Sequence, residues 1–202
     1  MPSIDPDVFN DRLQIIRLGK LTKDALTLTF ADTGATKRIP LTDEQHSLLA
    51  NINPTSFTDT YRQSQREFLI SLAERDALRI LTAASTLNDF DYVLAVEHTL
   101  SIGKNPFDSG VFVIGQVGSF NLSDIGSRFL SAVDGRRTVA QIAEHIQQEI
   151  LRSEDGTSYI RDLAKTTGRP LYAHLTDAAV AVTKGLADTK SGGAYPAADT
   201  SV

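Results

Sequence analysis

The sequence contains no cysteine among its 202 residues. This absence excludes disulfide bonds, thiolate nucleophiles, thiolate-ligated zinc and iron–sulfur clusters. Long apolar runs are missing too, because no stretch approaches the ~20 apolar residues that a membrane-spanning helix needs. The first residues carry acids where a secretory signal would carry basic residues. We therefore expect a soluble, cytoplasmic protein with no membrane partner.

Positive charge is also in short supply. The chain has 20 Lys and Arg against 25 Asp and Glu, which gives a formal net charge of −5. A negative protein is repelled by phosphate backbones and anionic lipids, so this balance disfavours non-specific binding to DNA or to membranes. The same field mildly favours a basic partner segment.

Recognisable catalytic motifs are absent. No H-x-x-x-H or H-E-x-x-H spacing and no G-x-S-x-G elbow occur, and Gly115–Gly118 lacks the strand and helix that frame a phosphate-binding loop. We interpret Gly115–Gly118 as a hairpin turn. The histidines are scattered, which favours surface or capping roles for His46, His98, His145 and His174. The sequence therefore predicts no catalytic residues, no metal site and no cofactor.

The first half of the chain changes from strand patterns to helix patterns. Residues 13–41 predict strands, including an alternating Leu26–Phe30 and a hairpin partner at Lys37–Leu41, with Pro40 at a strand end or edge. Thr42–Gln45 fits a capping box that opens a short helix. Further helices are predicted after Ser56, with Phe57 and Tyr61, and over residues 64–81.

The second half repeats the change after a weakly patterned boundary at residues 82–89. Strands are predicted at 92–96, 111–114 and 119–122, then a helix capped by Ser123 and one opened by Thr138–Gln141. Residues 153–174 form an insertion, with a possible helical turn near 159–163, and a last helix starts after Thr176. The fold class is α+β, with two tandem winged-helix-like units, each a small antiparallel sheet followed by about three helices. The predicted parts are residues 1–85, residues 90–190 and a flexible tail at 191–202.

The two halves show a weak internal repeat. Residues 39–43 together with Leu48 and Leu49 match residues 120–124 together with Phe129 and Leu130. In each half a hairpin leads into a capped short helix. A chance match between two common helix starts is the alternative explanation.

Residues 110–146 resemble the PqqD family. The positions that carry this resemblance are Phe120-Asn121, Phe129-Leu130, Asp134-Gly135 and Thr138–Ala143. With the flanking elements the resemblance covers about 92–190, and a degenerate second copy is predicted at 13–81. The 22-residue insertion at 153–174 departs from the compact family pattern. It leaves open whether the second groove is accessible, filled by the insertion or used by a partner protein.

The resemblance implies a RiPP recognition element, which binds the leader of a ribosomally made precursor peptide. Such a module takes the leader as an extra strand beside its third strand, in a groove closed by its third helix. In the second unit the implied peptide-binding residues are Val117, Ser119, Phe120, Asn121, Ala178, Val182 and Leu186. In the first unit they are Lys37, Arg38, Ile39, Leu41, Phe68, Leu72 and Arg75. For the apolar members an ordinary core role is the alternative, and Arg136-Arg137 is either a clamp for an acidic leader residue or an exposed turn.

The implied function is a non-catalytic subunit that presents a precursor peptide to a separate enzyme of the radical-SAM, YcaO or multinuclear iron oxidase type. The alternative is a winged-helix DNA-binding regulator, since the topology is similar. The last helix argues against DNA, because Lys184 and Lys190 are balanced by Asp177 and Asp188. An enzyme of unfamiliar chemistry and a structural assembly protein remain as further alternatives.

Overall fold

A computed structural model describes residues 14–52, 61–82, 85–105 and 110–198, and these fold into two compact units. Unit 1 comprises residues 1–93 and 193–202, and unit 2 comprises residues 94–192. Both contain helices and small antiparallel sheets, so the predicted α+β class is confirmed. In the described part of the chain, no helix combines the length and the apolar character needed to cross a bilayer.

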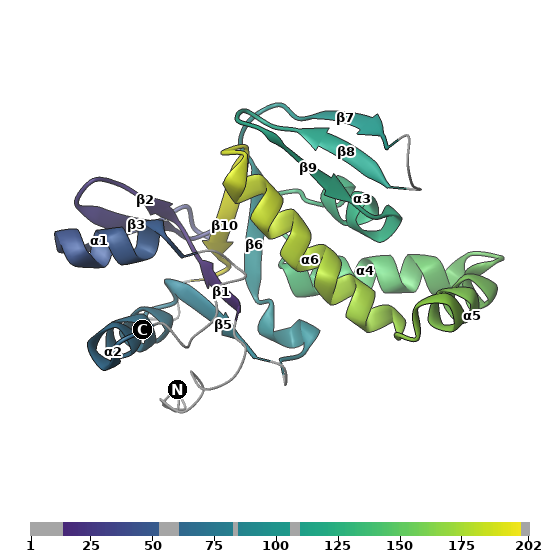
Figure 1. The fold of residues 1–202 in the computed structure, drawn as a ribbon, viewed down its shortest axis with the longest axis horizontal. Helices are drawn as coiled ribbons and strands as arrows, with labels where there is room; N and C mark the ends of the chain where they lie inside the picture. Colours follow the sequence, from purple (N-terminus) through teal and green to yellow (C-terminus); the bar gives the residue numbers. More distant parts are fainter. Residues whose placement is uncertain (1–13, 53–60, 83–84, 106–109, 199–202) are drawn as a thin grey trace. The chain divides into compact units, whose positions relative to one another are not determined.

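Unit 1 starts with strands and continues with helices (Figure 1). Its elements in chain order are β1 (Gln14–Arg17), β2 (Lys20–Leu21), β3 (Ala25–Thr29), β4 (Thr36–Pro40), α1 (Asp43–Ala50), α2 (Gln63–Ala73), β5 (Leu78–Leu81) and a 3₁₀ turn at Leu87–Asp89. Strands β2, β3 and β4 form an antiparallel sheet in that order, and β1 pairs antiparallel with β5. The helix predicted from Ser56 and Phe57 lies outside the described residues.

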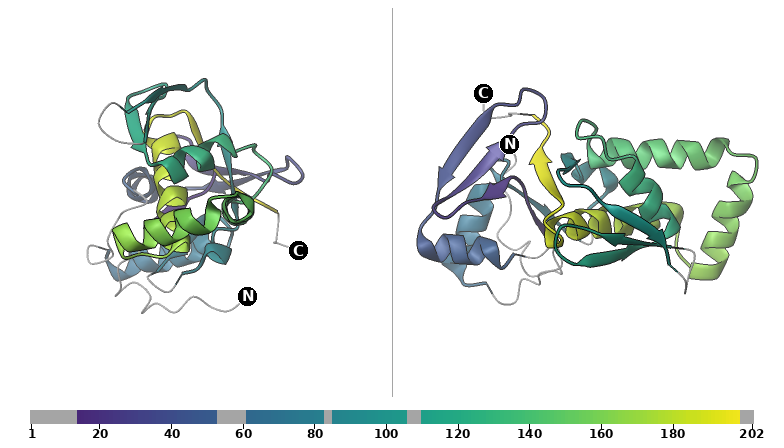
Figure 2. Two further views of the ribbon diagram at one scale, coloured as in Figure 1. Left: turned by 90° about the vertical axis from the view of Figure 1, so that its right-hand side faces the viewer. Right: turned by 90° about the horizontal axis from the view of Figure 1, so that it is seen from above.

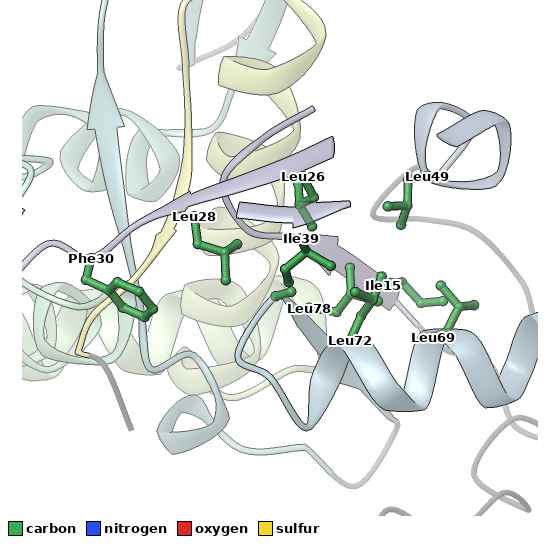
Figure 3. Packing of buried hydrophobic residues seen from close by; sticks show 10 residues of the cluster. Ile15, Leu26, Leu28, Phe30, Ile39, Leu49, Leu69, Leu72 and Leu78 are labelled. Atoms are coloured by element: carbon green, nitrogen blue, oxygen red, sulfur yellow. The ribbon is translucent and has the colours of Figure 1, made fainter. Parts of the chain in front are cut away.

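The core of unit 1 lies between the sheet and α2. Leu26 and Leu28 alternate along β3 and are fully buried, as a strand with one covered face requires. Leu69 and Leu72 come from one stripe of α2, three residues apart, and complete the same cluster (Figure 3). Ile39 of β4 belongs to the same cluster, so α2 covers the inner face of the sheet.

The helix predicted over residues 64–81 is shorter than expected. Helix α2 ends at Ala73, Asp76 takes a left-handed φ of 57°, and residues 78–81 form strand β5. The apolar run of β5 is short enough to suit a helix or a strand. Pairing with β1, in which Ile15 lies opposite Ile80, decides in favour of the strand.

Unit 2 also starts with strands and continues with helices. Its elements are β6 (Tyr92–Val96), whose first residues belong to unit 1, then β7 (Ser101–Lys104), β8 (Val111–Ile114), β9 (Ser119–Leu122), α3 (Asp124–Ser131), α4 (Val139–Arg152), α5 (Gly156–Thr167) and α6 (Leu171–Asp188). Strands β7, β8 and β9 form an antiparallel sheet in that order. Helix α6 packs against α3, α4 and β9 (Figures 1 and 2).

The predicted helix starts are confirmed by hydrogen bonds. Thr42 and Thr138 each form a complete capping box with Gln45 and Gln141, at the starts of α1 and α4. The Ser123 hydroxyl accepts from the Gly126 N–H at 3.1 Å at the start of α3. These starts could be predicted because a cap depends on residues within one turn of each other.

Two predictions for the end of unit 2 need correction. The 153–174 insertion forms a complete helix, α5, which ends at Gly168 with a left-handed φ of 68°. The last helix, α6, begins at Leu171 behind Pro170 rather than after Thr176. Strand β7 was not predicted, because Ser101–Lys104 is exposed throughout and carries no alternation of burial.

The chain does not end in a flexible tail over residues 192–196. These residues form strand β10 (Gly192–Pro196), which pairs with β6. The segment also binds the body of unit 1. The Gly19 N–H donates to the Ala194 carbonyl at 2.7 Å, and the Ala31 N–H donates to the Pro196 carbonyl at 3.0 Å. Backbone groups carry these bonds, so side-chain patterns gave no sign of them.

The internal repeat is more extensive than the sequence suggested. Each half begins with a single strand, β1 or β6, and continues with a three-stranded antiparallel sheet and a capped eight-residue helix. Each half then ends in a strand that pairs with its first one, β5 with β1 and β10 with β6. This shared order extends the similarity of the two helix starts to the strands on either side of them.

The docking of β10 predicts that unit 1 depends on the far end of the chain. A chain that stops at Gly192 loses the bonds from Gly19, Ala31 and Asp32 to residues 194–197, at about 1 kcal/mol each. We expect unit 1 to lose about 3 kcal/mol of unfolding free energy. Urea denaturation and exchange of those three amide protons measure this loss. A chain that stops at Ala198 is the control, and equal stability of the two truncated chains would contradict the prediction.

Candidate functional site

Strand β4 exposes backbone hydrogen-bonding groups along one edge of the first sheet. The Leu41 N–H donates to Asp24 and the Phe30 N–H donates to Ala35, both at 2.9 Å, which sets which residues bond to β3. Because bonding alternates along an antiparallel pair, Thr36, Arg38 and Pro40 direct their backbone groups away from β3. Within the described residues no strand pairs with this side of β4.

Pro40 fits this arrangement. It is the last residue of β4 and occupies an outward position, where a missing N–H breaks no bond of the sheet. The prediction that Pro40 lies at a strand end or edge is confirmed. It also shows that the backbone of β4 accommodates proline at an outward position.

Strand β9 is the equivalent edge of the second sheet. The Gly115 N–H donates to Gly118 at 3.1 Å, which confirms the predicted hairpin turn and sets the alternation. Ser119 and Asn121 therefore direct their backbone groups away from β8. The two edges are alike in their backbone, so any difference between them comes from what lies beside them.

One face of β9 packs against α6. A Cβ at Gly185 would lie 2.3 Å from Cδ2 of Phe120, so the phenyl ring packs directly on the helix backbone. The turn before β9 is bound to the end of the same helix. The Gln116 N–H donates to the Ser191 hydroxyl at 2.8 Å, and the Val117 N–H donates to the Thr189 carbonyl at 2.9 Å. No groove for a peptide remains between Phe120 and Gly185.

The residues predicted for the second groove therefore fall into two groups, buried core residues and residues with exposed surface. Val182 and Leu186 are fully buried and Ala178 is 3% exposed, so all three belong to the core and do not line an open groove. Phe120 is half-buried against α6, while Val117, Ser119 and Asn121 are exposed. The helix residues were misassigned because a groove-lining stripe and a core stripe have the same spacing along a helix.

A pocket of about 150 Å³ opens between α1 and α2 in unit 1. Its apolar wall consists of Leu48 and Phe68, both half-buried. Its polar wall consists of Thr42, Glu44, Gln45, Ser64 and Gln65. Thr42 follows the last residue of β4 by only two residues, so the pocket lies close to the end of that strand.

Of the seven residues predicted for the first site, one lines this pocket. Phe68 lines the pocket, and Leu41 and Lys37 are half-buried nearby in sequence. Ile39 and Leu72 are 4% and 0% exposed, so they are core residues rather than peptide contacts. Arg38 is exposed and pairs with Asp24, and Arg75 is exposed in the turn after α2.

Most residues of the pocket wall were not predicted as site residues from the sequence. Glu44, Gln45 and Leu48 belong to the helix that the capping box predicted, and their spacing places them within two turns. Ser64 and Gln65 lie in the first turn of α2, which begins at Gln63. The sequence patterns did not predict that α1 lies beside α2, because that arrangement depends on contacts between segments distant in the sequence.

Arg17 and Arg137 have structural roles. Arg17 donates from Nη1 to the Leu49 carbonyl at 2.8 Å, and burial lowers the pKa of its guanidinium. Arg137 donates from Nε to Asp134 at 2.8 Å and from Nη2 to the Ala132 carbonyl at 3.0 Å. Of the two explanations for Arg136-Arg137, the turn therefore fits Arg137 better than a clamp for a peptide.

Asp134 organises that turn. Its carboxylate accepts from the N–H groups of Arg136 and Arg137 at 2.9 Å each. These bonds, the Arg137 N–H first, lower the pKa of Asp134 from 3.8 to about 2.

No family model matches the chain, and neither a curated protein nor a solved structure matches it significantly. The resemblance to the PqqD family therefore stays a prediction.

The pKa of Asp134 gives a pH prediction. A carboxyl whose pKa is lower in the folded state stabilises the protein above its unfolded pKa of 3.8. That contribution is lost as pH falls from about 4 through about 2. We expect an NMR titration midpoint for Asp134 near 2 and a weaker acid dependence of stability in Asp134→Asn. A midpoint at the ordinary aspartate value would contradict the hydrogen bonds described here.

The contact between Phe120 and Gly185 gives a packing prediction. Gly185→Ala places a methyl group into the phenyl ring and should cost about 1–3 kcal/mol of unfolding free energy. Combining it with Phe120→Ala should recover part of that cost, which a double-mutant cycle in urea measures. Gly103→Ala is the control, because a Cβ there meets nothing within 4 Å. Additive effects of the two substitutions would show that the ring does not lie on α6.

Proposed function

We propose that this chain is a cytoplasmic, non-catalytic peptide-binding protein that takes an extended peptide as an added strand beside β4. The observation that carries the proposal is the outward edge of β4, whose end lies two residues before Thr42, a residue that lines a partly apolar pocket. Thr36 and Arg38 each offer an N–H and a carbonyl, and Pro40 offers a carbonyl. Strand addition satisfies such groups, while pockets beside the edge select side chains.

An anchoring side chain is necessary for this mode of binding. Each backbone hydrogen bond contributes only about 1 kcal/mol net, because the same groups bond to water in the free state. Burial of one large aliphatic side chain adds about 2 kcal/mol. The pocket between α1 and α2 has room for such a side chain, so the edge and the pocket form one site. In unit 2, Phe120 lies on Gly185 and the helix residues predicted for the groove are core residues, so we assign the peptide to β4.

In this proposal unit 1 binds the peptide and unit 2 serves another purpose. The family resemblance is clearest in unit 2, so the two criteria point to different halves. We give the pocket beside α1 and α2 more weight than the family resemblance, because a bound peptide needs space for its side chains in a module of any family. The bound peptide would be the leader of a precursor, and a separate modifying enzyme would act on the rest of it.

Unit 2 offers a surface suited to docking such an enzyme. Phe112 and Ile114 point to the same face of β8 and are 37% and 49% exposed. Their cross-strand neighbours are uncharged, namely Gly103 and Asn121 for Phe112, and Ser101 and Ser119 for Ile114. Exposed aromatic and aliphatic groups without nearby charge are typical of protein–protein contacts.

The DNA-binding alternative has less support. Nine residues of α6 are buried, and its charged residues are Lys184 against Asp177 and Asp188. Helix α2 carries Arg66 against Glu67. A helix that reads a DNA groove needs an exposed face with an excess of basic residues to meet the phosphates.

Strand addition can be tested by removing one outward N–H from β4. Arg38→Pro keeps the bonds to β3 but leaves a peptide carbonyl unpaired, so affinity should fall about tenfold or more. Peptides would be selected from a random-peptide library on the full chain, and their affinities measured by calorimetry. Arg38→Gln, which keeps the N–H, should change affinity less than about threefold.

Ser119→Pro is the matched control in β9 and should leave affinity unchanged. Loss of binding in Ser119→Pro instead of Arg38→Pro would move the site to unit 2. Recovery of no peptide, together with retention of duplex DNA, would favour the regulator.

A further inference from the structure

We infer that the pocket between α1 and α2 selects a basic side chain, lysine or arginine, in the bound peptide. This inference rests on the proposed function and deepens it, because it names the chemical class of peptide that the site prefers. The wall of the pocket, its acceptors and its size all favour such a side chain.

The wall of the pocket combines an apolar part with one charged group. Leu48 and Phe68 supply the apolar part, and Glu44 is the only ionisable residue among those that line it. In the described part of the chain, Glu44 forms no ion pair. A long basic side chain matches both features, since its methylene stem covers apolar surface while its charged end stays at the rim.

Three of the neutral side-chain acceptors at the rim already accept hydrogen bonds. Oε1 of Gln45 accepts from the Thr42 N–H at 3.0 Å, and the Thr42 hydroxyl accepts from the Gln45 N–H at 3.3 Å. Oε1 of Gln65 accepts from the Arg62 N–H at 2.9 Å. The Glu44 carboxylate therefore remains as the strong acceptor for an incoming cation.

The size of the pocket suits one side chain and no more. Its volume is about 150 Å³, comparable to a cavity that holds a benzene molecule. An aliphatic side chain would fit but would leave Glu44 facing it without a partner, and an acidic one would be repelled. The formal net charge of −5 adds a weak general attraction for a basic peptide.

Selection of peptides on three forms of the full chain tests the inference. A random-peptide library would be selected on the wild type, on Glu44→Lys and on Glu74→Lys. We expect Lys or Arg to be enriched at one position by the wild type and by Glu74→Lys, whose altered residue lies outside the pocket. Glu44→Lys should replace that preference by Asp or Glu.

A milder pair of changes covers the case in which Glu44→Lys disturbs α1. Replacing the enriched basic residue of a recovered peptide by Met should weaken binding to the wild type about two- to fivefold, because an exposed ion pair contributes modestly. The same replacement should have little effect on binding to Glu44→Gln. Calorimetry gives both ratios, and circular dichroism checks the fold.

The outcomes separate this inference from the proposed function. Peptides that bind with no basic preference, or with a preference that Glu44→Lys leaves unchanged, overturn the inference and leave strand addition standing. Recovery of no peptide by the wild type overturns both.

Discussion

The inner face of each three-stranded sheet is apolar, and a helix later in the chain has to cover it. In unit 1 this is α2, which brings Leu69 and Leu72 over Leu26 and Ile39. In unit 2 it is α6, which packs on β9 and on the helices around it. The position of that helix relative to the last strand of the sheet determines how much room a peptide finds beside the sheet.

Small residues decide the difference between the two units. Gly185 lets the phenyl ring of Phe120 approach the backbone of α6, and Gly115 lets the turn before β9 approach Thr189 and Ser191. Side chains at either position would hold the strand and the helix apart. Unit 1 has no equivalent contact among its described residues, and a pocket remains between α1 and α2. Two halves with one order of elements therefore offer different surfaces.

The division of the chain between the units has consequences for function. Residues 193–197 bind to unit 1 through backbone hydrogen bonds, although 99 residues of unit 2 precede them. The peptide-binding edge that we propose belongs to a unit that contains segments from both ends of the described chain. Unit 2 carries the exposed apolar pair, Phe112 and Ile114, to which our proposal assigns a different partner.

The sequence by itself determined the features that depend on neighbours along the chain. The caps at Thr42, Ser123 and Thr138, the hairpin at Gly115–Gly118 and the edge position of Pro40 all follow from interactions within a few residues. Only the tertiary structure decided that Leu78–Leu81 is a strand, that Gly192–Pro196 is ordered, and that Val182 and Leu186 are core. Each of these depends on a partner distant in the sequence, and the same apolar spacing serves a core and a groove equally well.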